Sequence, residues 1–498
     1  MADSIWNGTV LASYCYDLGN GSNTFVGLVE AANGLVQLFV AVPVGTYADG
    51  VDEKGVTRKV WVTRLACPMT FVAAACTSAV TWTITFWMGG RDTALKWALI
   101  LVMMIWGLTE AVVMGPFQAM FADSIPTGER SKYYSLLYAT YIGASAAGPL
   151  VSIVLFCVWG NTWSPRQLAK VLLSGMALEV LSSPLFLAFS ERSLLGAEAD
   201  AATDQREETD EVSRARRGEQ LVPWTLFSAS LLSSLGSGMT VKFFPLFFRE
   251  TVGLSPINVQ IIYAVVPLAM VIGMAVAQHL HPIIGRVQTM CVCKLFGVVL
   301  LVAMIGLVQN AASSSHYDLL LVTVYVLRTC LANCTYPIEE SVLMDFVPRS
   351  RRARWKSLES ISSFGWCGAA LVGGLIADKY SYTATFSVTA CFQFAATLLV
   401  ATLIFIVPRT ESELRRGHQD EDHYRRLEDN EDATLDFNRS SSMGAPSTTS
   451  DEHARISLHA VHGNSGEGDL ARHEGSADTS ASFIVESVDD NVRNPILR

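Results

Sequence analysis

The sequence of 498 residues predicts an all-α membrane protein built from two six-helix halves, twelve transmembrane helices in total with the first one truncated. Half of the residues are hydrophobic and only 16% are charged, a balance that soluble domains of this length do not show. A polar stretch of fourteen residues that begins at Asp123 returns in altered form at Asp345, 222 residues later, with six apolar segments between the copies. An even number of crossings returns both copies to one membrane face, as expected of parallel repeats related by an axis along the membrane normal.

Eleven stretches of about twenty or more mostly apolar residues are each long enough to cross a hydrocarbon core as a helix. In chain order they are residues 25–48, 60–87, 95–119, 135–158, 168–189, 222–248, 259–280, 290–309, 319–344, 358–376 and 383–407. The repeat requires a twelfth helix before residue 25, where only residues 5–16 are available, too few to span. We therefore expect Met1 to lie inside the first helix, with further coding sequence upstream. A transcript without in-frame apolar codons ahead of Met1 would refute this expectation.

The apolar segments divide the chain into an N-terminal transmembrane half (1–189), a connector (190–221), a C-terminal transmembrane half (222–408) and an acidic tail (409–498). The tail holds 19 Asp and Glu against 10 Lys and Arg, so it carries most of the net charge of −10. Because the tail is polar and lacks apolar periodicity, we expect it to be disordered. The ten cysteines lie in apolar segments without paired spacing and the tail histidines are scattered, so no disulfide framework, metal site or cofactor is predicted.

The distribution of basic residues predicts the orientation of this multi-pass protein in its membrane. Residues 49–59, 121–134, 190–221, 281–294 and 346–356 carry 17 Lys and Arg, whereas the alternate loops carry about six. Short loops rich in Lys and Arg stay on the cytoplasmic side. We therefore expect both repeat loops, the connector and the tail to be cytoplasmic, in a plasma or an organelle membrane alike.

The apolar run that starts near residue 27 ends in Gly45-x-x-x-Asp49 and is followed by Arg58 and Lys59. It resembles the second helix and adjoining cytoplasmic signature of the major facilitator superfamily, and the resemblance covers residues 1–408. In that family the pattern is Gly, three residues, Asp, a basic residue, one residue, Gly and two basic residues, so residues 50–57 stretch the spacing here. The candidates for its counterpart in the second half are Gly273 and Gly285-Arg286. The resemblance implies a transporter that alternates between inward-open and outward-open states, with Asp49 acting in a cytoplasmic gate.

The two repeat loops suggest further gate residues on physical grounds. Asp123 and Asp345 lie where helices end, near carbonyl dipoles that disfavour an anion, while Arg130 and Arg352 precede helices whose N-termini disfavour a cation. Each charge becomes favourable if acid and base pair within a loop or with the loop of the other half, in contacts that break when the cytoplasmic face opens. The alternative is that they are solvated topology charges, worth little singly. Repetition of the acid as well as the base favours the gate.

Polar side chains inside the apolar segments are costly in lipid and should face a partner or a water-filled cavity. Glu30, Asn33 and Gln37 are spaced by three and four residues, so they line one stripe of a helix. The other candidates for substrate or ion translocation are Glu110, Gln118, Lys242, Arg328 and Glu339. A carboxylate among them could carry a proton, and Lys242 or Arg328 could hold an anionic substrate group. Alternatively, Glu110 or Glu339 neutralises Lys242 or Arg328 and locks helices together.

Taken together, these patterns predict a secondary active transporter of a small solute, with proton coupling through Glu30, Glu110 or Glu339 as a hypothesis. Its expected partners are a small-molecule substrate, protons and the lipid bilayer, with no nucleic acid. The alternative is a non-transporting receptor or scaffold on the same fold that signals through its cytoplasmic tail. An enzyme is not predicted, because the chain carries no nucleotide motif, paired-carboxylate hydrolase pattern or nucleophile elbow.

Overall fold

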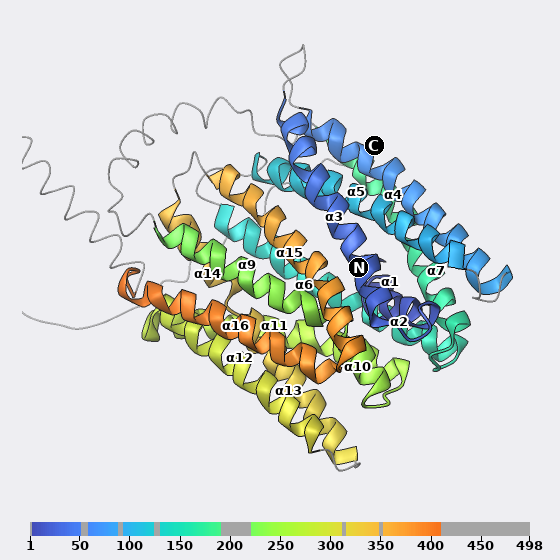
Figure 1. The fold of residues 1–498 in the computed structure, drawn as a ribbon. Helices are drawn as coiled ribbons and strands as arrows, with labels where there is room; N and C mark the ends of the chain where they lie inside the picture. The colour runs from blue at the N-terminus through green and yellow to red at the C-terminus, as the bar shows by residue number, and fades with distance from the viewer. Residues whose placement is uncertain are drawn as a thin grey trace, which may run out of the picture. The chain divides into compact units, whose positions relative to one another are not determined.

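The computed structural model describes residues 2–50, 58–87, 93–123, 130–190, 221–310, 315–347 and 352–409 (Figure 1). They belong to the first of the two units into which the chain divides, Met1–Tyr424. Helices and the turns between them make up this part of the chain. The predictions made for the connector and for the acidic tail fall, apart from a few flanking residues, outside the described residues.

The N-terminal half contains the elements up to residue 188. They are α1 (Ala2–Trp6), α2 (Thr9–Leu18), α3 (Asn23–Asp49), α4 (Lys59–Trp82) with a π-helical turn (Thr83–Trp87), α5 (Thr93–Asp123), α6 (Arg130–Trp159), and α7 (Pro165–Ser182) with a 3₁₀ turn (Ser183–Ala188). Serine side chains cap the N-termini of α3 and α7. The hydroxyl of Ser22 accepts from the amide of Phe25, and that of Ser164 accepts from the amide of Gln167. The short α1 and α2 lie largely inside the core of this half, where Trp6 and Tyr14 are fully buried.

The C-terminal half repeats the pattern. Its elements are α9 (Leu221–Val241), α10 (Phe244–Glu250), α11 (Pro256–Ile284), α12 (Arg286–Gln309), α13 (Ser315–Asn333), α14 (Tyr336–Phe346), α15 (Arg352–Lys379), and α16 (Tyr382–Thr402) with a 3₁₀ turn (Leu403–Phe405). Ser255 and Ser381 cap α11 and α16 in the same way as the serines of the first half.

All eleven predicted segments are helical, and ten helical spans of the described chain are long and apolar enough to cross a membrane. The exception among the predicted segments is α15, which lies between α3 and α9 and packs against both (Figure 1). A Cβ atom on Gly374 would overlap the backbone of Asn23, and one on Gly27 would overlap that of Ala370, so the helices approach closely. A helix covered by protein on two sides needs less apolar surface than one that faces lipid, which explains the weaker hydropathy of α15.

Two of the predicted helices are interrupted, which the sequence analysis did not foresee. The segment 222–248 breaks between α9 and α10, and the segment 319–344 breaks between α13 and α14. The reason lies in Pro245 and Pro337, which have no amide hydrogen to donate to the carbonyl four residues earlier. Those carbonyls belong to Val241 and Asn333, the last residues of α9 and α13. A third break separates α1 from α2.

The two halves meet along α3 against α15 and along α6 against α11. In the first of these pairs the helices run antiparallel, so the last turn of α3 and the first turn of α15 lie at one end of the bundle. We call this the Asp49 end, and the opposite end, where α15 finishes, the Asp378 end. If the positive-inside prediction holds, the Asp49 end is cytoplasmic.

Candidate functional site

A mostly buried ion pair joins the two halves of the bundle. Lys242, at the break between α9 and α10, places its Nζ 2.9 Å from Oε1 of Glu30 on α3. The same ammonium donates to Oδ1 of Asn7, 3.4 Å away, at the break between α1 and α2. The two charged side chains are only 16% and 12% exposed. Two helix breaks, one from each half, therefore face each other across a mostly buried charge pair, as at the substrate and ion sites of broken-helix transporters.

Glu110 lies next to this pair but is not its partner. The Asn33 side chain on α3 donates to Oε1 of Glu110 on α5 at 3.4 Å. Among the described residues, no basic side chain forms an ion pair with Glu110. The alternative in which Glu110 neutralises Lys242 is not realised here, because Glu30 takes that role. The side chain of Gln118 lies outside the described set, and Gln37 is partly buried on α3.

Arg328 on α13 occupies a different environment, inside the C-terminal half. It is 3% exposed, and its Nη2 donates to Oε1 of Gln393 on α16 at 3.0 Å. Gln393 in turn donates to the hydroxyl of Ser237 on α9. The guanidinium carbon lies 5.6 Å from the centre of the Phe244 ring, and its Nε has no hydrogen-bond partner. A cavity of about 260 Å³ borders the guanidinium.

Glu339 does not neutralise Arg328, contrary to one alternative left open by the sequence. Its carboxylate lies 2.9 Å from Nζ of Lys294 on α12 and accepts a hydrogen bond from Thr335 at 2.8 Å. On one continuous helix, Glu339 would lie three turns from Arg328 on nearly the same face. The break between α13 and α14 removes that register, and Glu339 reaches a neighbouring helix instead.

The predicted gate lies at the Asp49 end, where many side chains fall outside the described set. These are Asp49, Asp123, Arg130 and Arg352, each of which ends or begins a helix. Asp345 is described, and it forms an ion pair with Arg286 at the start of α12, within its own half. Arg286 is almost fully buried and was noted in the sequence only as part of a weak counterpart signature.

The first-half signature is structurally simple. Gly45 lies within α3 with open space where a Cβ would be, and Lys59 begins α4. The Arg58 guanidinium stacks over the ring of Tyr47 at 4.9 Å, which bridges the stretched spacing between the two helices. Pairing of Asp49 in the gate stays a prediction.

At the Asp378 end, a set of hydrogen bonds that the sequence analysis missed closes the space between the halves. Asp378 of α15 accepts from the backbone amides and side chains of Asn23 and Thr24 at 2.6–2.9 Å, and from the hydroxyl of Ser22. The carboxylate thus caps the N-terminus of α3 from the other half. Burial alone would raise the pKa of Asp378, but the hydrogen bonds from Thr24 and Asn23 outweigh it and hold the pKa below its ordinary value of 3.8. The position of an acid directly after the segment 358–376 was the only sequence signal.

Other contacts reinforce the closure. Arg249 forms an ion pair with Asp17 and stacks over Trp163, whose indole donates to the Leu254 carbonyl at 2.8 Å. The Tyr382 hydroxyl donates to the side chain of Asn23 at 2.8 Å. The structure is therefore closed at the Asp378 end.

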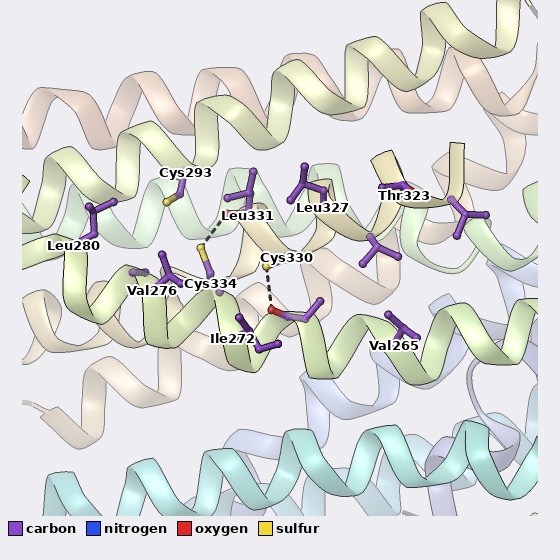
Figure 2. Close-up of a pocket in the computed structure, with 15 residues that line it drawn as sticks. Val265, Ile272, Val276, Leu280, Cys293, Thr323, Leu327, Cys330, Leu331 and Cys334 are labelled. Carbon is purple, nitrogen blue, oxygen red and sulfur yellow. Dashed lines mark hydrogen bonds between the residues drawn. The ribbon is translucent and has the colours of Figure 1, made fainter. Parts of the chain in front are cut away.

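An apolar groove of about 590 Å³ lies between α11 and α13 (Figure 2). Its wall includes three thiols, and Cys330 donates to the Ala269 carbonyl at 3.1 Å (Figure 2). Ile272, at its rim, is 67% exposed. A groove with almost no polar lining that opens on the outer surface of a membrane bundle suits lipid chains, and it offers a polar solute no partner.

These observations define a class of protein: a multi-pass membrane carrier made of two similar helical halves, with a buried ion pair between the halves beside two helix breaks. The Major Facilitator Superfamily model matches residues 2–354 and again residues 226–443. The chain belongs to this family, so both the predicted family and the predicted two-half fold are confirmed. It is a secondary active transporter, and proteins of this family are generally not enzymes.

Solved structures agree with this fold. A D-xylose-proton symporter matches with a TM-score of 0.62 at 12% identity, over 82% of this chain and 95% of that one. A bacterial homologue of the iron transporter ferroportin in its inward-facing state gives 0.60 at 14% identity, over 80% and 94%. The nucleoside transporter NupG gives 0.55 at 14% identity, over 81% and 96%. No curated protein matches the chain.

Proposed function

We propose that this transporter moves a small solute by alternating access and that the Lys242–Glu30 ion pair is the central link between its halves. The pair supports the proposal because it joins Lys242, at the break between α9 and α10, to Glu30 on α3 of the other half, 2.9 Å apart and mostly buried. When the halves rock, the Asp378 end opens and the Asp49 end closes, and the geometry of the pair changes with them. In this scheme the pair stabilises the conformation closed at the Asp378 end.

The proposal also assigns proton coupling to Glu110. Of the three carboxylates considered from the sequence, Glu30 and Glu339 are engaged in ion pairs with Lys242 and Lys294. Glu110 accepts only from the amide of Asn33 among the described hydrogen bonds, so gaining or losing a proton there breaks no ion pair. Asp3, Glu30 and Lys242 interact electrostatically with Glu110, which couples its protonation to the link between the halves.

Distances between spin labels test alternating access without knowledge of the solute. One label pair at the Asp378 end replaces exposed Arg166 and Tyr380, and one at the Asp49 end replaces exposed Leu187 and Ile283, each through an unnatural amino acid. We expect Lys242→Met to lengthen the first distance and shorten the second in nanodiscs. If the protein were a receptor or scaffold with a rigid bundle, each label pair would give one distance that Lys242→Met leaves unchanged. That result would overturn the proposal.

Proton coupling is tested by currents on a solid-supported membrane. A panel of sugars, nucleosides and carboxylates is applied to proteoliposomes at pH 6 and pH 8. For any solute that gives a current, Glu110→Gln is expected to abolish the pH-dependent current and to preserve exchange of labelled solute across the membrane. A pH-dependent current that survives in Glu110→Gln would exclude Glu110 as the proton site.

A further inference from the structure

The cavity beside Arg328 is a partly open chamber of mixed polar and apolar lining within the C-terminal half, and neither Lys242 nor Glu30 lines it. Residues of α9, α11, α13 and α16 line it, together with Trp366 of α15. Its polar lining includes the hydroxyls of Ser237, Tyr325 and Thr329. A volume of about 260 Å³ is at the small end of the range for ligand pockets, so the chamber suits a small solute.

The chamber carries uncompensated positive charge. Two cations line it, Arg328 and Lys294, and only Lys294 has a carboxylate partner, Glu339 at 2.9 Å. No Asp or Glu is among the described residues that border the chamber. Arg328 is 3% exposed, its Nη2 donates to the neutral side chain of Gln393, and its Nε is buried without an acceptor among the described residues. A buried guanidinium in this situation lacks the anion that such a group normally requires.

The buried arginine at position 328 has no counterpart in the N-terminal half. At the repeat offset of 222, the residue that corresponds to Arg328 is Trp106 of α5. Trp106 is buried in the core of the N-terminal half, where its indole donates to Thr77 at 2.9 Å. The repeated fold therefore packs without a cation at this place, and the guanidinium is an addition by the C-terminal half.

We infer that this chamber binds a small monocarboxylate through Arg328, as the solute of the transporter proposed above, on which the transport part of the inference rests. A carboxylate has two oxygens in a plane, which match the remaining guanidinium donors. One uncompensated positive charge fits a monoanion better than a dianion such as a phosphate ester. An amino acid is disfavoured, because its ammonium group would find no carboxylate on the described wall.

Thermal stabilisation of the full-length protein in lipid nanodiscs tests the inference. Sodium acetate, butyrate and benzoate are compared with acetamide, butyramide and benzamide, with alanine and with sodium phosphate, at an ionic strength set by sodium chloride. At least one carboxylate is expected to raise Tm in the wild type and in the control Arg166→Gln, whose residue is exposed on α7. The amides, alanine and phosphate are expected to have no such effect. Equal stabilisation by an amide, or none by any carboxylate, overturns the inference.

Two variants connect the effect to Arg328. Arg328→Gln is expected to weaken carboxylate binding at least tenfold. Gln393→Glu places a carboxylate against the guanidinium at the position of the present 3.0 Å hydrogen bond, so it should occupy the site internally, raise Tm without ligand and abolish binding. If Arg328→Gln does not fold, Gln393→Glu still tests whether Arg328 holds the carboxylate. Carboxylate binding that persists in Gln393→Glu would refute the assignment.

The outcomes for transport and for binding are distinguishable. If the spin-label distances respond to Lys242→Met but no carboxylate binds, only the solute assignment fails. If a carboxylate binds through Arg328 but the distances never change, alternating access fails and the chamber is the ligand site of a non-transporting protein.

Discussion

The ion pair between Lys242 and Glu30 gives the sharpest quantitative prediction. In the wild type the Lys242 and Glu30 side chains are only 16% and 12% exposed. Lys242→Met removes the cation and leaves the Glu30 carboxylate mostly buried without its partner. At 2.9 Å and an effective dielectric constant of 20, the Coulomb attraction that is lost is about 6 kcal/mol. Partial access of water and relaxation reduce this value, and removal of one partner of a buried pair costs about 3–5 kcal/mol in measured cases. We expect a loss near the lower limit, about 3 kcal/mol.

A double-mutant cycle separates the pair from its surroundings. The free energy of unfolding is measured by SDS titration in mixed micelles for the wild type, Lys242→Met, Glu30→Gln and the double variant. Each single change is expected to cost about 3 kcal/mol, and the double variant should lose at least about 1.5 kcal/mol less than the sum of the two. The exposed Lys170 of α7 supplies the control, since Lys170→Met should change stability by less than about 0.5 kcal/mol. Losses that add within about 0.5 kcal/mol would refute the reasoning.

Four further predictions concern the ends of the bundle and the cavity. Asp378→Ala removes the carboxylate that caps α3. Because this carboxylate is exposed, its loss should destabilise the closed state relative to the open state by only about 1–2 kcal/mol, measured as a longer spin-label distance at the Asp378 end. Because the pKa of Asp378 is lowered from 3.8, its stabilisation of the closed state is complete above pH 4 and is lost only as the pH falls through the lowered pKa. Spin-label distances at the Asp378 end that change between pH 5 and pH 8 in the wild type but not in Asp378→Asn would contradict this. Asp345→Asn should destabilise the protein by about 3 kcal/mol in SDS titration by leaving Arg286 buried without its anion, and the charge exchange Asp345→Arg with Arg286→Asp should recover more than half. Gln393→Glu should raise Tm in the absence of any solute, and an unchanged or lower Tm would mean that Arg328 is already compensated.

Much of the fold could be predicted because lipid imposes a simple rule on sequence. A helix that crosses the bilayer needs about twenty apolar residues, and such stretches are visible without knowledge of any contact. The family signature around Gly45 and Asp49 and the repeated loops were equally visible, since both are local patterns. The breaks at α9–α10 and α13–α14 were not visible in this way, because Pro43, Pro68 and Pro149 also stand inside apolar runs and their helices continue.

The partners of the buried charges were not predictable in this way. The sequence placed Glu30, Glu110 and Glu339 as acids and Lys242 and Arg328 as bases inside the membrane, and it left open which acid meets which base. Periodicity determines the face of a single helix on which a residue lies. The rotation and vertical register of one helix against another decide the contacts between helices, and these depend on packing across the whole bundle.

The sequence by itself therefore determined the class of protein, the apolar segments and the costly polar residues, because each of these is a property of one segment in lipid. Only the tertiary structure decided that Lys242 meets Glu30, that Glu339 meets Lys294, and that Arg328 has no anion among its described neighbours. The physical reason is that an ion pair needs atoms about 3 Å apart. Such proximity between residues more than two hundred positions apart arises only when the helices pack.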